Sequence, residues 1–147
     1  MTKCELSPLA VHVDFEKALV NAVRSQFPNA MIVGCYFHFK QAIFRCLKKT
    51  HIHTEQVKMA MESNCIDLLT IVPKKEIVKC GIPYLKMVIK SMPDFKESDV
   101  KKWDGVWVCF QRFWYSDESL VATWNIHDKK TNGHPGIHNC TKNGLER

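Results

Sequence analysis

The stretch LAVHVDFEKALVNAVRSQFPNA, residues 9–30, decides the fold at the N-terminal end of the chain. Apolar residues alternate with other residues over 9–13, and this pattern predicts a short strand. The apolar residues that follow recur at helical spacing and predict one buried helix face, made of Phe15, Ala18, Leu19, Ala22, Val23 and Phe27. Asp14 lies at the joint between the predicted strand and the predicted helix.

Two roles are open to Asp14. A carboxylate at such a joint can cap the helix, because it accepts hydrogen bonds from the N–H groups of the first turn. The same joint is the carboxyl end of a strand, where open α/β sheets place catalytic side chains. Caps are far commoner than active sites, so the local sequence favours the cap and leaves a metal-binding role open.

The next segment repeats the alternation of strand and helix. Residues 31–34 form a continuous apolar run, which is typical of a strand covered on both faces. A helix is expected from Phe37 to Lys49. The first fifty residues therefore read as strand, helix, strand, helix, the order that predicts an α/β fold.

The pattern becomes helical from Thr54 to about Tyr115. Pro73 and the Gly81–Pro83 segment divide this region into three or four predicted helices. Its most distinctive segment, KKWDGVWVCFQRFWY, places aromatic residues at helical spacing: Trp103, Trp107, Phe110 and Trp114. We interpret them as a helix face that packs into the core, in preference to an exposed surface that stacks nucleic-acid bases.

Composition narrows the class of protein. The 147 residues suit one domain, and no apolar stretch approaches the roughly 20 residues that cross a bilayer, so no membrane partner is expected. The seven cysteines are spread along the chain and fit a reducing compartment better than a disulfide framework. The net charge of +6 permits an acidic partner such as DNA or RNA.

Cys35 and His38 have the C-x-x-H spacing of half a zinc site. The second half would need another close pair, such as His51 with His53 or His138 with Cys140. None of these pairs has zinc-finger spacing, so we favour packing roles at the corner between strand and helix.

Two segments carry a resemblance to a known family. VDFEKALVNAVRSQFPNAMIVGCYFHFKQAIFRCLKK, within residues 11–49, resembles the core of the MULE (Mutator-like element) transposases, with its D-x-E-x-A-L, F-P-x-A and G-C-x-F-H-x-x-Q motifs. The closing TKNGLER resembles the family's T-N-N-x-x-E-R segment, and TWNIHDKK resembles the W-N that precedes it. Lys142 stands where the family usually has Asn.

The resemblance implies an RNase H-like fold, here a partial core interrupted by a helical insertion. Residues 1–50 would be the partial core, 51–118 the insertion, and 119–147 the return to the core with the start of a final helix. By resemblance, Asp14 and Glu146 are two of the three catalytic metal-binding carboxylates, and the ions are Mg²⁺ or Mn²⁺. Cys35, His38 and Asn143 would lie near this active site.

The implied function is metal-dependent DNA cleavage and strand transfer in DNA transposition. The upstream strand that carries the first catalytic Asp has no counterpart before Leu9, so we expect a truncated fragment that is inactive alone. The alternative is a non-catalytic DNA-binding or protein-interaction module derived from a transposase. DNA is the expected partner, the nucleus follows from that partner, and self-association is left open.

Overall fold

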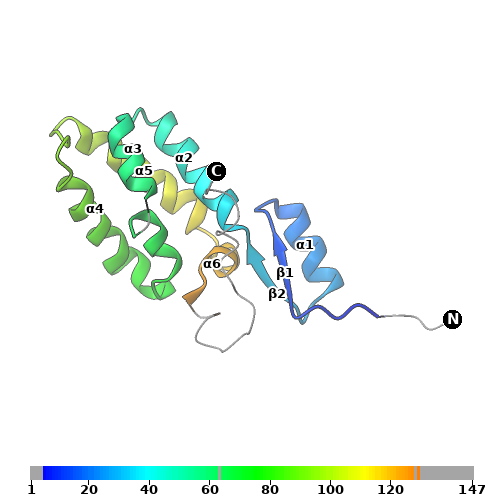
Figure 1. The fold of residues 1–147 in the computed structure, drawn as a ribbon. Helices are drawn as coiled ribbons and strands as arrows, with labels where there is room; N and C mark the ends of the chain where they lie inside the picture. The colour runs from blue at the N-terminus through cyan, green and yellow to red at the C-terminus, as the bar shows by residue number, and fades with distance from the viewer. Residues whose placement is uncertain (1–4, 63, 128, 130–147) are drawn as a thin grey trace.

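The computed structural model describes residues 5–62, 64–127 and 129 of the chain. Over these residues the protein is mostly helical and has a small parallel sheet, which confirms a mixed α/β class. Figure 1 shows the sheet and helix α1 at one end of the molecule and helices α3, α4 and α5 at the other. Helices α2 and α6 lie between these two ends and connect them.

The N-terminal segment forms a strand–helix–strand unit of β1 (Ala10–Val13), α1 (Lys17–Gln26) and β2 (Met31–Gly34). The two strands are parallel, and their register pairs Ala10 with Met31 and Val13 with Gly34. A parallel pair needs a crossover connection, which α1 provides. The predicted order of elements over these residues is confirmed.

The predicted buried face of α1 is wrong in most of its members. Val20 and Val23 are the buried residues of the helix, and they pack with Val13 of β1. Leu19 is exposed, as are both alanines of the predicted face. The face that packs on the sheet is instead centred on Val20 and Val23, with Phe27 of the predicted face packed against the same cluster.

The remaining helices follow in one run. They are α2 (Tyr36–Lys49), α3 (Thr54–Met61), the 3₁₀ turns η1 (Ile66–Thr70) and η2 (Lys74–Glu76), the π-helical turn η3 (Ile77–Gly81), α4 (Ile82–Lys90), α5 (Asp99–Trp114) and α6 (Glu118–Trp124). The helical character predicted for 54–115 is confirmed. The expected break at Gly81–Pro83 is not a loop, because η3 runs directly into α4, and Pro83 occupies the first turn of α4, where proline is tolerated.

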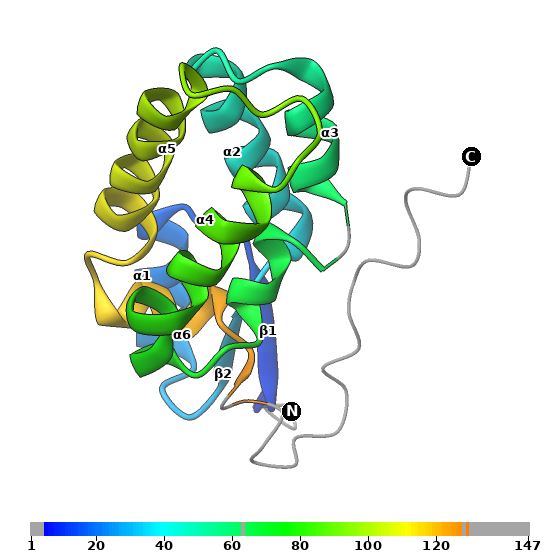
Figure 2. The same cartoon turned by 90° about the vertical axis from the view of Figure 1, so that its left-hand side faces the viewer.

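One large core joins the helices from α2 to α6. The aromatic face predicted on α5 supplies its centre, since Trp103, Trp107 and Phe110 are each 3% exposed or less. Trp124 of α6 completes it, because its ring stacks on the ring of Phe39 at 5.3 Å. The interpretation of the α5 aromatics as core residues is confirmed. Figure 2 shows α4 in front of α2, with α5 on one side and α3 on the other.

A buried polar network fastens α3 to α5. The Gln56 amide donates to the Asp99 carboxylate at 2.8 Å, and the Trp103 indole N–H donates to the Gln56 carbonyl oxygen at 2.9 Å. The backbone N–H of Lys96 also donates to Asp99, at 3.0 Å. The Gln56 and Lys96 hydrogen bonds lower the pKa of Asp99, because they stabilise the charged carboxylate.

No helix within the described ranges has the length and apolar content of a membrane span.

Candidate functional site at the carboxyl edge of the sheet

The structure brings Asp14 and Cys35 to neighbouring positions where β1 and β2 end. The backbone N–H of Cys35 donates to the carbonyl oxygen of Val13 at 2.7 Å, one residue beyond the paired strands. Asp14 and Cys35 are therefore the first residues after two adjacent parallel strands. This edge of a parallel sheet is where α/β proteins bind their ligands.

The Asp14 carboxylate forms a turn and does not cap α1. Its Oδ1 accepts a hydrogen bond from the backbone N–H of Glu16 at 3.0 Å, and Glu16 is the residue that precedes the helix. The predicted capping role is therefore wrong. The reason is that residues 14–16 form a separate turn between strand and helix. The turn occupies one carboxylate oxygen of Asp14 and fixes the side chain at the edge of the sheet.

Phe15 lies within this turn and packs away from α1. Its ring meets the ring of Trp114 edge-on at a centroid distance of 4.8 Å, so the residue belongs to the large helical core and not to the face of α1. The ring also lies over Gly34, where an added Cβ would be 2.5 Å from Phe15 Cζ. Only glycine at this position allows such a close approach. The sequence pattern did not predict this pair, because Phe15 also fits the helical spacing of α1.

The predicted site residues on α2 and beyond it differ in exposure or lie outside the described residues. Cys35 is half-buried and precedes α2, whereas His38 is exposed on the first turn of α2. Within the described ranges, no three His, Cys, Asp or Glu side chains are grouped so that they could hold a metal ion. Glu146 and Asn143 lie outside the described residues.

A second polar group lies beside the same end of α2. The Tyr36 hydroxyl donates to the Asp67 carboxylate at 3.2 Å, and the Lys40 ammonium donates to the Met61 carbonyl oxygen at 2.6 Å. Burial, with the Asp67 charge, raises the pKa of Tyr36, and burial lowers the pKa of Lys40. The two hydrogen bonds tie η1 and the end of α3 to α2, close to the candidate site.

Lys129 holds the outer side of β2. Its ammonium donates to the carbonyl oxygens of Ile32 at 2.9 Å and Thr123 at 2.8 Å, and so joins the strand to α6. Burial, helped by the charge of Lys74, lowers the pKa of Lys129 to about 8. A lysine is one of the devices that protect a strand edge from pairing with another chain. No local pattern in the sequence predicts this long-range contact.

Comparison of the chain with models of protein families, with curated proteins and with solved structures found no match in any of the three.

Proposed function

We propose that this chain is part of a MULE-type transposase and contributes to a metal-dependent site for DNA cleavage and strand transfer. The observation that carries the proposal is the position of Asp14 beside Cys35 at the carboxyl edge of two parallel strands. The motif resemblance assigns a catalytic carboxylate and a nearby cysteine to these two residues. A shared sheet edge is the arrangement that such a site needs.

The path of the chain supports an RNase H-like core with a helical insertion. The strand–helix–strand–helix unit ends with α2, and the helical region follows it. The chain then returns to the sheet, because α6 contacts β2 and Lys129 bonds to the carbonyl oxygen of Ile32. An insertion in a core domain has this path, since its two ends must come back to the same sheet.

Divalent ions bound in such a site would supply activation of water or of a 3′-hydroxyl and stabilisation of the leaving oxygen. Asp14 offers the hard carboxylate oxygen that Mg²⁺ and Mn²⁺ prefer. The Cys35 thiol and His38 imidazole are softer ligands and do not replace a second carboxylate. In this proposal Glu146 supplies the second carboxylate. The hydrogen bond from the Glu16 N–H holds the Asp14 carboxylate in place.

Metal-dependent stabilisation tests the site directly. We expect Mn²⁺ to raise the melting temperature of the native chain, since a ligand that binds only the folded state stabilises it. Asp14→Asn keeps an acceptor for the Glu16 N–H and removes the charge, so it should abolish most of the increase, as should Glu146→Gln. Asp104→Asn, at an exposed carboxylate of α5, is the matched control and should retain it. An equal increase in all four proteins would refute the metal site.

The expected inactivity of the chain has a separate test. Purified protein incubated with supercoiled plasmid and Mn²⁺ should neither join DNA strands nor nick the plasmid. Metal-dependent nicking that disappears in Asp14→Ala and in Glu146→Ala would show that the chain is a working nuclease. That result would overturn the inactivity and strengthen the assignment of both carboxylates.

One observation favours a non-catalytic DNA-binding module as the second candidate. The outer face of α2 carries two exposed phenylalanines, Phe37 and Phe44, and the Lys48 ammonium lies 5.7 Å from the centroid of the Phe44 ring. Arg45 is exposed on the same helix. Cations beside exposed aromatic rings suit a single strand of nucleic acid, whose bases stack on the rings while its phosphates meet the cations.

Binding of a labelled single-stranded oligonucleotide distinguishes the two candidates. The module predicts affinity without added metal that falls steeply with salt, because bound counterions are released from the phosphates. It also predicts weaker binding by Phe37→Ser/Phe44→Ser and by Arg45→Ala. Binding that depends on Mn²⁺ and on Asp14 would instead favour the catalytic site.

A further inference from the structure

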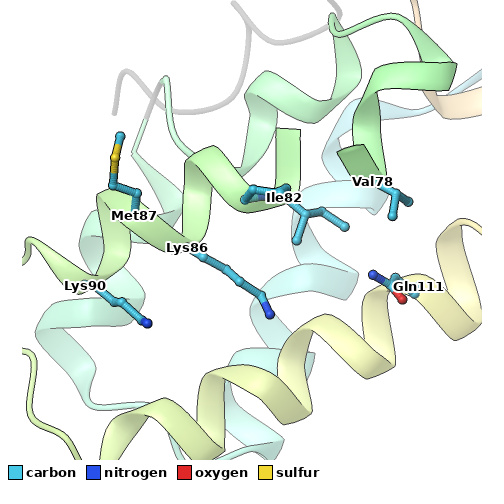
Figure 3. A pocket seen from close by; sticks show the side chains of 7 residues that line it. Val78, Ile82, Lys86, Met87, Lys90 and Gln111 are labelled. Carbon is cyan, nitrogen blue, oxygen red and sulfur yellow. The ribbon is translucent and has the colours of Figure 1, made fainter. Parts of the chain in front are cut away.

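A groove of about 480 Å³ separates the helical run η3–α4 from α5. Figure 3 shows the side chains of Val78, Ile82 and Lys86 on one wall and Gln111 of α5 on the other. Lys90 extends the first wall by one turn. The groove lies in the helical region, away from the strands that hold the candidate metal site.

The wall residues define the length and shape of what fits. Positions 78, 82, 86 and 90 are each four residues apart along a continuous helical run, and so they form one stripe. At about 1.5 Å per residue, this stripe is roughly 18 Å long, which matches about three turns of another helix. A groove between two helices is a common binding site for an amphipathic helix.

The stripe changes character along its length. The apolar half consists of Val78, which is exposed, with Ile82 buried beneath the groove at 3% exposure, and Lys86 and Lys90 form a cationic half. Lys86 donates to the Asp104 carboxylate at 3.2 Å, and the two side chains are 42% and 58% exposed. An exposed ion pair contributes little and exchanges easily. The groove is lined by two lysines, and Asp104 pairs with Lys86, so the charges of these three side chains sum to a net positive charge.

A small inner pocket, of about 110 Å³, lies beside the same two lysines and reaches Trp107. The Trp107 side chain is buried, and its indole N–H has no hydrogen-bond partner among the described residues. A buried donor without an acceptor is costly, and such groups are rare in folded proteins. An acceptor oxygen brought into this pocket would remove that cost, which is a reason independent of charge to expect a carboxylate there.

We propose that the groove binds a short amphipathic helix of a partner protein, with apolar side chains against Val78 above the buried Ile82, and carboxylates at Lys86 and Lys90. This interaction does not depend on the proposed DNA chemistry. A second copy of the chain fits less well, because two chains of net charge +6 repel each other. DNA also fits less well, because half of the stripe is apolar.

The test uses the full 147-residue chain and a pair of labelled probe peptides. Each peptide has 12 residues in a helix-favouring sequence, with leucines along one face and either glutamates or lysines at the end of that face. We expect fluorescence anisotropy to show at least ten-fold tighter binding of the glutamate peptide. Lys86→Glu/Lys90→Glu should reverse the preference. Lys49→Glu/Lys58→Glu makes the same charge change at exposed sites outside the groove, and it should keep the preference.

A steric variant separates the groove from the general charge of the protein. Gln111→Trp places a large ring at the mouth of the groove and should weaken the binding of the glutamate peptide about ten-fold, with unchanged thermal melting. Three outcomes would overturn the proposal. They are equal binding of the two peptides, an unchanged preference in Lys86→Glu/Lys90→Glu, and displacement of the glutamate peptide by duplex DNA or by unlabelled chain.

Discussion

The sheet end and the helical end of this protein are held together in different ways. At the sheet end, Val13, Val20 and Val23 form a small buried cluster. At the helical end, the helices pack around one continuous core, which includes aromatic residues of α2, α5 and α6. Because apolar burial is the dominant favourable term in folding, most of the stability should come from the helical end. The candidate metal site lies at the less stable end, and Phe15 anchors it to the stronger one.

The largest expected effect comes from breaking the helical core at Phe39. This ring packs against Trp114 and Trp124, so Phe39→Ala should lower the free energy of unfolding by about 3–5 kcal/mol. Chemical denaturation followed by circular dichroism measures the loss. Phe37→Ala, two residues earlier on the same helix and 59% exposed, is the control and should cost less than about 0.5 kcal/mol. Equal losses would mean that the helical core is not the main source of stability.

The polar network at Asp99 is a second way to weaken the helical end. Asp99→Ala removes the acceptor for Gln56 and for the Lys96 N–H, and it should cost about 3 kcal/mol. Asp104→Ala, which removes an exposed ion pair with Lys86, should cost less than about 1 kcal/mol. If both changes cost the same, the buried network contributes no more than a surface pair.

Acid titration gives the Asp99 network a second readout. The pKa of Asp99 is lowered in the folded state, so the unfolded chain takes up a proton at a higher pH than the folded chain does. The stabilisation is therefore complete above the ordinary aspartate pKa of 3.8 and is lost as the pH falls below it. The native protein should lose more stability than Asp99→Ala over this acidic range. Parallel pH profiles would contradict the role of the carboxylate.

The link between the two ends is tested at Gly34. A methyl group there collides with the Phe15 ring, so Gly34→Ala should cost about 2 kcal/mol and displace the Asp14 turn. Gly105→Ala is a control of opposite sign, because nothing lies near its added Cβ and alanine favours a helix over glycine by about 1 kcal/mol. Loss of the Mn²⁺-dependent stabilisation in Gly34→Ala alone would show that Phe15 positions the site.

The smallest expected loss of stability comes from weakening the small valine cluster at the sheet end. Val23→Ala removes two buried methyl groups from a small cluster and should cost about 1–2 kcal/mol. Hydrogen exchange should then speed up in β1 and α1 while the amides of α5 stay protected, since weakly packed units open locally. Leu19→Ala, at an exposed position of the same helix, should leave the exchange unchanged. Uniform acceleration through α5 would mean that the two ends unfold as one unit.

Local pattern predicted those parts of the fold that depend on neighbouring residues. The spacing of Trp103, Trp107 and Phe110 fixed which face of α5 is buried, because a helix with that spacing has only one continuous apolar face. The apolar runs that end at Val13 and Gly34 likewise identified both strands, and Asp14 and Cys35 followed as the residues at their ends. The link from Asp14 to Glu146 came from the motif resemblance and from no spacing rule.

The sequence by itself therefore determined the element order, the aromatic core and the residues at the sheet edge. Only the tertiary structure decided that Phe15 packs on Trp114 and not on the face of α1, that Asp14 forms a turn in place of a cap, and that Lys129 bonds to the outer side of β2. Each of these depends on a partner elsewhere in the fold. A local pattern indicates which side chains can be buried. Packing between distant segments decides which partner buries a side chain or bonds to it.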